Sequence, residues 1–96
     1  MKKNFQLTDT KLAPARQVDA VKHEIKKYIA RERRKKLSED FDHWDFDCKI
    51  GEDSSKSHEV SLSDINKSID EFVAKDLKSF YLEILAKQAR RLKKSL

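Results

Sequence analysis

The sequence predicts an α+β protein in which four strands and two helices follow the order β-α-β-β-α-β. Three observations lead to this prediction. Residues 43–50 alternate between apolar and polar side chains, which is typical of a half-buried strand. Residues 18–29 repeat apolar side chains at helical spacing, and residues 79–86 carry them at every second position. With two helices on one face of a four-stranded sheet, this order indicates the ferredoxin-like plait.

The N-terminal third supplies a short strand and a long helix. Residues 3–7 alternate so that Phe5 and Leu7 share a side, which suits a strand. Pro14 fits the first turn of a helix, where its missing N–H costs nothing. The helix is expected to run to about Lys36, with one apolar stripe made of Val18, Val21, Ile25, Tyr28 and Ile29.

The remainder supplies a hairpin, a second helix and a last strand. In residues 43–50 the apolar side is Trp44, Phe46, Cys48 and Ile50, and the polar side is His43, Asp45, Asp47 and Lys49. A polar loop at 51–57 leads to a second strand at 58–62. A helix follows, with the stripe Ile65, Ile69, Phe72 and Val73, and ends near Asp76 or Leu77. We therefore expect one domain over residues 1–87 and a basic C-terminal tail, helical or frayed, over 88–96.

Charge is distributed unevenly along the chain. Residues 1–36 hold 12 Lys and Arg against 4 Asp and Glu, a net +8. Residues 37–86 hold 5 against 13, a net −8, and residues 87–96 hold five cations and no acid. An asymmetry of this kind indicates an anionic partner or pairing between copies of the chain.

Composition also limits the class of protein. Cys48 is the single cysteine, so an intramolecular disulfide and a multi-cysteine zinc site are excluded. The first ten residues have a basic start but no apolar stretch behind it, and no segment approaches the ~18 apolar residues of a spanning helix. A cytoplasmic location is therefore expected.

Three segments carry a resemblance to a known family. They are PARQVDAVKHEIKKYIARERRKKL (14–37), DHWDFDCKIG (42–51) and SFYLEILAK (79–87). Together they resemble a family of small uncharacterised bacterial proteins, known as a domain of unknown function. The resemblance implies a bacterial cytoplasmic protein, and it implies no activity, cofactor or site residue.

The strongest functional feature is the basic first helix together with the tail. Crowding Arg33 to Lys36 costs like-charge repulsion, which an anionic partner relieves. We expect a small cytoplasmic binding module associated with nucleic acid, RNA rather than DNA, either as RNA itself or in the ribosome. Its candidate residues are Lys22, Lys26, Lys27, Arg31, Arg33, Arg34, Lys35, Lys36, Arg90 and Arg91. The alternative is a protein-interaction module or a homodimer in which the basic helix meets the acidic segment of a second copy.

The way in which nucleic acid is contacted depends on which sheet face is open. Plait-fold RNA-binding proteins stack bases on aromatic side chains of that face. If the face with Asp45 and Asp47 is the open one, stacking is not expected, and the helix and tail contact phosphates instead.

Catalysis is not expected. One glycine excludes glycine-rich phosphate loops and strained nucleophile elbows, and no Ser/His/Asp or Cys/His arrangement stands out. His43, Asp45 and Asp47 share a strand face and are candidates for a metal or acid–base site, although charged side chains on an outer strand also discourage aggregation. Cys48 alternates with core residues and is expected to be a buried, inert thiol. No cofactor, metal or membrane partner is predicted.

Overall fold

The computed structural model describes residues 1–8 and 11–90. Its regular elements are β1 (Lys2–Gln6), α1 (Pro14–Arg33), β2 (His43–Gly51), β3 (His58–Val60), α2 (Ile65–Ala74) and β4 (Ser79–Ala89). Two 3₁₀ turns, η1 (Ser54–Lys56) and η2 (Leu62–Asp64), flank β3. The predicted element order is therefore confirmed, and each predicted strand and helix is present.

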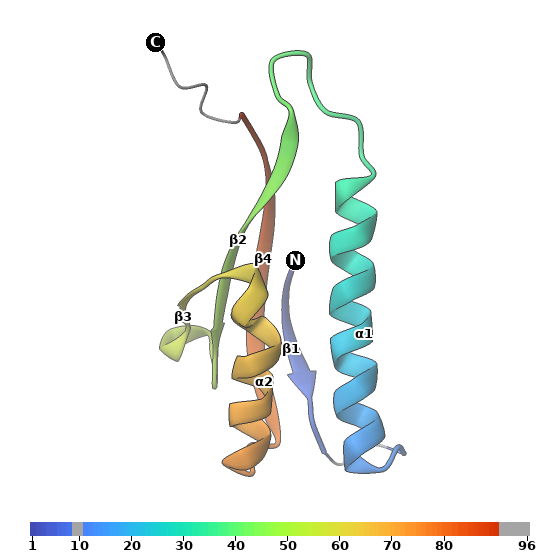
Figure 1. The fold of residues 1–96 in the computed structure, drawn as a ribbon. Helices are drawn as coiled ribbons and strands as arrows, with labels where there is room; N and C mark the ends of the chain where they lie inside the picture. Colours follow the sequence, from blue (N-terminus) through green and yellow to red (C-terminus); the bar gives the residue numbers. More distant parts are fainter. Residues whose placement is uncertain (9–10, 91–96) are drawn as a thin grey trace.

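The four strands form one antiparallel sheet in the order β1-β4-β2-β3. Both helices lie on the same face of it (Figure 1). In the ferredoxin-like plait the first and third strands are the central pair, whereas here β4 and β2 are central, so the predicted plait order is not confirmed. The lengths explain the difference. β3 has three residues and cannot serve as a central strand, while β2 pairs with β4 along the whole of β2, from His43↔Ala89 to Gly51↔Tyr81.

The core lies between the sheet and the helices. Phe80 of β4 is at its centre, with its ring centroid 5.4 Å from that of Phe5 and 5.7 Å from that of Phe72. The buried residues come from the predicted apolar stripes, but Val73, predicted in the stripe of the second helix, is 41% exposed. The buried residues are Phe5, Leu7, Val21, Ile25, Phe46, Cys48, Ile50, Ile65, Ile69, Phe72, Phe80, Leu82 and Ile84.

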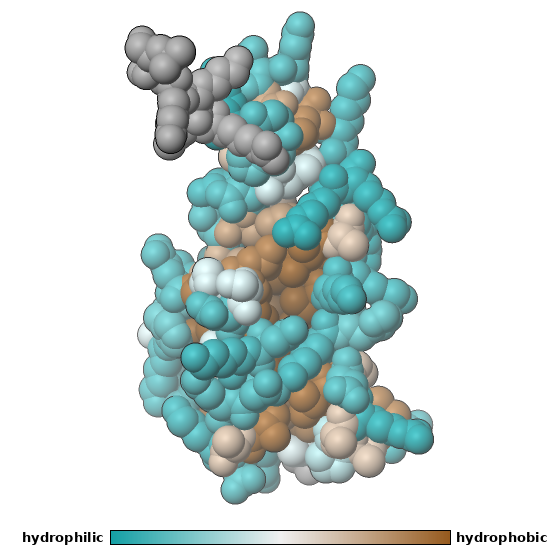
Figure 2. Space-filling model, in the orientation of Figure 1, coloured by the Kyte–Doolittle hydropathy of each residue, from teal (hydrophilic) through white to brown (hydrophobic). Residues whose placement is uncertain are grey.

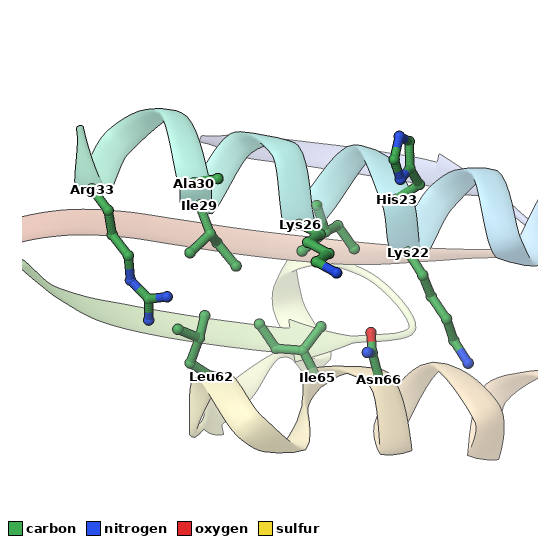
Figure 3. Close-up of a pocket in the computed structure, with 10 residues that line it drawn as sticks. Lys22, His23, Lys26, Ile29, Ala30, Arg33, Leu62, Ile65 and Asn66 are labelled. Atoms are coloured by element: carbon green, nitrogen blue, oxygen red, sulfur yellow. The ribbon is translucent and has the colours of Figure 1, made fainter. Parts of the chain in front are cut away.

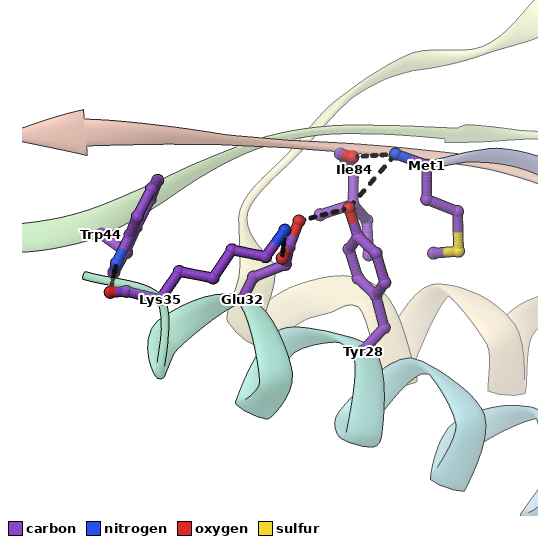
Figure 4. Close-up of polar contacts among 6 residues, drawn as sticks. All are labelled: Met1, Tyr28, Glu32, Lys35, Trp44 and Ile84. Carbon is purple, nitrogen blue, oxygen red and sulfur yellow. Dashed lines mark hydrogen bonds and ion pairs between the residues drawn. The ribbon is translucent and has the colours of Figure 1, made fainter. Parts of the chain in front are cut away.

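The C-terminal end of α1 is attached to the sheet by polar contacts (Figure 4). The Trp44 indole Nε1 donates to the Lys35 carbonyl oxygen at 2.9 Å, just beyond the helix. About two turns earlier, the Tyr28 hydroxyl donates to Glu32 Oε1 at 3.2 Å and accepts from the Met1 nitrogen. Met1 in turn donates to the Ile84 carbonyl oxygen at 2.6 Å. Helix α1 ends at Arg33, three residues before the predicted end, because the chain there turns to follow these contacts.

The last strand is longer than predicted. Gln88 and Ala89, expected in the tail, pair with Trp44 and His43 of β2 and so belong to the sheet. The Gln88 side-chain Oε1 also accepts from the Ser38 N–H. The rest of the predicted tail, residues 91–96, lies outside the described residues.

Candidate functional site

The cations of α1 form two separate stripes. Lys27, Arg31 and Arg34 follow the spacing i, i+4, i+7 and are all exposed; we call them the basic ridge. Lys22, Lys26 and Arg33 follow the spacing i, i+4, i+11 on the flank that faces α2; we call them the rim. At ~100° per residue the two stripes are about 120° apart around the helix axis. Thus the predicted cations do not form one surface.

Two acidic side chains of α1 form ion pairs with residues outside the ridge. Glu24 forms an ion pair with Lys3 of β1, with 2.6 Å between Oε2 and Nζ. Glu32 forms an ion pair with Lys35 and accepts from Tyr28. The hydrogen bond from Lys35 is the main cause that lowers the pKa of Glu32. Within residues 1–8 and 11–90, no ion pair joins a ridge cation to a carboxylate, so the ridge retains its positive charge.

The rim cations have different surroundings. Lys22 is half-buried and forms an ion pair with Asp70 of α2. The Arg33 guanidinium lies over the Phe46 ring, with 5.5 Å between Cζ and the ring centroid. Lys26, between them, is exposed and has no ion pair among the described residues. The rim therefore carries one cation already paired and two that are not.

The remaining predicted cations lie beyond the helix. Lys35 is paired with Glu32, and Lys36 is exposed. Arg90 follows β4 and lies over Phe41, with 5.6 Å between Cζ and the ring centroid. Phe41 belongs to a loop that carries Glu39, Asp40 and Asp42, so the charge around Arg90 is mixed. Arg91 lies outside the described residues.

A groove separates α1 from α2, with a volume of about 470 Å³. Figure 3 shows Lys22 and Arg33 reaching from α1 toward α2 at its two ends, with Leu62, Ile65 and Asn66 facing them. Ile25 and Ile29 of α1 complete the apolar lining. Sequence reasoning missed this groove. The available signal was that Ile29 lies at the edge of the α1 stripe, where a side chain is only partly covered; Leu62 was predicted in the strand at 58–62 and instead begins η2.

The open face of the sheet is the polar one. Asp45, Asp47 and Lys49 of β2 are exposed on it, and Asp47 Oδ1 bonds Lys87 Nζ at 2.9 Å. Tyr81 of β4 carries an aromatic ring on this face; the ring is partly covered, and its hydroxyl donates to Glu83. A face with carboxylates and one partly covered ring does not provide the platform that base stacking requires.

The side chains considered for a metal or acid–base site have separate partners. His43 Nδ1 contacts the neighbouring Asp42 at 2.6 Å, and Asp47 is bonded to Lys87. Over residues 1–8 and 11–90, no group of three or more His, Cys, Asp or Glu side chains could hold a metal ion. Cys48 is buried, as expected, and burial, then Asp47 and Asp45, raise the pKa of its thiol. A thiol of raised pKa is a poor nucleophile at neutral pH.

Comparison with known proteins places the chain in a family. No described helix is long and apolar enough to cross a membrane. A search of curated proteins and a search of solved structures each found no match. One family model, described as a family of unknown function, matches residues 1–95. The chain therefore belongs to the DUF6172 family, as the resemblance of its three segments to a domain of unknown function implied.

Proposed function

We propose that this protein is a small nucleic-acid-binding module, with RNA as the expected ligand, that contacts phosphates through the basic ridge. The observation behind the proposal is the ridge itself. Lys27, Arg31 and Arg34 are exposed on one helix face, while Glu24 and Glu32 of α1 form ion pairs with Lys3 and Lys35. Three cations over about 10 Å of helix match a charged backbone better than a small anion.

The open sheet face favours this mode of contact over base readout. Since that face carries Asp45, Asp47 and Glu83, a nucleic acid laid across it meets carboxylates. Contacts through a helix face alone reach phosphates without reading bases, so we expect little sequence preference. Steep salt dependence should accompany such binding, because each contacted phosphate releases condensed counterions.

The test is fluorescence anisotropy of labelled single- and double-stranded RNA and DNA over a salt series. If each ridge cation contacts one phosphate, the logarithm of the association constant for a single strand should fall with a slope of about −2 against the logarithm of salt concentration. Micromolar or tighter binding that persists at about 150 mM salt, which is close to physiological ionic strength, supports the proposal.

Two matched variants each replace three cations by glutamate, one on the ridge and one elsewhere on the surface. The triple variant Lys27→Glu, Arg31→Glu, Arg34→Glu reverses the ridge. The control Lys49→Glu, Lys75→Glu, Lys78→Glu reverses three exposed cations that lie off α1. We expect the ridge variant to lose binding and the control to keep most of it. Equal losses of affinity in the two variants would show that net charge alone explains binding. A ridge variant with the affinity of the original protein would refute the proposal.

A further inference from the structure

The groove between α1 and α2 has the character of a binding site separate from the basic ridge. Ile25, Ile29, Leu62 and Ile65 supply its apolar lining. Figure 2 shows the result on the surface, where hydrophobic residues form the centre of a hollow that hydrophilic residues border. A hollow of this kind, apolar within and polar at its border, is the usual form of an interaction site.

The shape of the groove indicates an elongated occupant. Its α1 side extends from Lys22 to Arg33, which corresponds to about 16 Å of helix at 1.5 Å per residue. An occupant of that length is about three turns of α-helix. Laid between α1 and α2, such a helix would place apolar side chains at i, i+3 or i+4, and i+7 against the isoleucine and leucine lining.

The charge of the groove indicates that its occupant is negatively charged. Its described lining contains Lys22, Lys26 and Arg33 but no Asp or Glu. Asp70 pairs with Lys22 at one end, which leaves Lys26 and Arg33 for a ligand. These two are seven residues apart on α1, so about 10 Å of helix axis separates them. Acidic residues at the same spacing on a partner helix would match both.

From this match of shape and charge we propose that the groove binds an amphipathic helix of another protein, with a leucine-rich stripe flanked by Asp or Glu. The chain itself offers no good occupant. Residues 91–96 contain Arg91, Lys93 and Lys94, the same sign as the rim. On a second copy, α2 carries Asp70 and Glu71, but its apolar side is already packed on the sheet. The proposal does not depend on nucleic-acid binding, since its groove residues are not ridge residues.

The probe is a fluorescein-labelled synthetic peptide of 14 residues, with leucine at i, i+3 and i+7 and glutamate beside that stripe. One control peptide has every glutamate replaced by lysine, and a second has a central proline that prevents the helix. We expect the acidic peptide to bind the full chain at least about tenfold more tightly than either control, because each control removes one of the two matched properties. In methyl NMR spectra, the signals of Ile29, Leu62 and Ile65 should shift.

Two neighbouring lysines supply the matched variants. Lys26 lines the groove and Lys27 does not, yet both are exposed residues in the middle of α1. Lys26→Glu should weaken binding of the acidic peptide about tenfold, and Lys27→Glu should leave it nearly unchanged. The ridge triple variant should also bind the peptide, which separates failure of this proposal from failure of the nucleic-acid proposal.

Four outcomes would overturn the inference. The acidic peptide could fail to bind, or it could bind both lysine variants equally. Dodecanoate alone could produce the methyl shifts and compete with the peptide, which would make the occupant an anionic lipid. Light scattering could give a dimer mass that falls to the monomer in the Leu62→Lys variant, which would make the occupant a second copy.

Discussion

Lys26 and Lys27 are consecutive residues of α1, yet Lys26 lines the groove toward α2, whereas Lys27 does not line it and is exposed to solvent. Successive helix residues point about 100° apart, so one basic sequence run serves two surfaces. The two proposed ligands therefore contact different residues.

This separation predicts that RNA and an acidic helical peptide bind together. Adding the unlabelled acidic peptide to a complex with labelled RNA should change the affinity for RNA by less than about threefold at 150 mM salt, because charges further apart than about 8 Å are largely screened. Sedimentation velocity should show a ternary complex. Displacement of RNA by the peptide would mean that the rim and the ridge act as one site.

Gly51 is required by a close backbone approach. A Cβ at this position would lie 2.6 Å from the Lys56 carbonyl oxygen and 2.7 Å from the Ser57 Cα. Both contacts are main chain, so the neighbour cannot move aside cheaply. Gly51→Ala should lower the free energy of unfolding by about 1–3 kcal/mol, as measured by urea denaturation. Glu52→Ala, one residue on and exposed, is the control and should change it by less than about 0.5 kcal/mol.

Asp76 adopts a left-handed backbone conformation that would suit glycine. It has φ 58°, and it follows α2 where the Leu77 N–H donates to the Phe72 carbonyl oxygen at 3.1 Å. Left-handed backbone at the end of a helix favours glycine. Asp76→Gly should raise the free energy of unfolding by about 0.5–1 kcal/mol, and Asp76→Val should lower it. A less stable glycine variant would show that the carboxylate itself contributes.

Cys48 should react with thiol reagents only when the protein opens. Its side chain is buried in the sheet, and burial, with Asp47 and Asp45, raises the pKa of the thiol above 9.0. Since the thiolate is the reactive form, Ellman's reagent at neutral pH should label the native protein slowly and the urea-unfolded protein at once. Prompt stoichiometric labelling of the native protein would contradict this burial.

Glu32 should contribute to stability against acid. The hydrogen bond from Lys35 is the main cause that lowers the pKa of Glu32 below its usual 4.5 in the folded protein. Between the lowered value and 4.5 the unfolded chain binds more protons than the folded one, so stability falls as pH drops through that window. Glu32→Gln should reduce the dependence of the unfolding midpoint on pH below 4.5, as measured by urea denaturation over a pH series.

The sequence by itself determined the order of elements and the side of each element that faces the core. Phe46, Cys48 and Ile50 are buried and Asp45 and Asp47 exposed, as alternation predicts. In α1, Val21 and Ile25 are buried, as the helical stripe predicts. These properties follow from periods of 2 and 3.6 residues, which any short segment expresses by its own backbone geometry.

Only the tertiary structure decided which strands are neighbours and what faces each flank of α1. The central position of β4, and its extension through Ala89, depends on pairing with β2 about 40 residues away. The division of the cations between rim and ridge depends on α2 lying beside α1, which places Leu62 and Ile65 opposite Lys26. Local periodicity sets the direction of a side chain along its own element, but its neighbour comes from a distant segment, and packing free energy selects that neighbour.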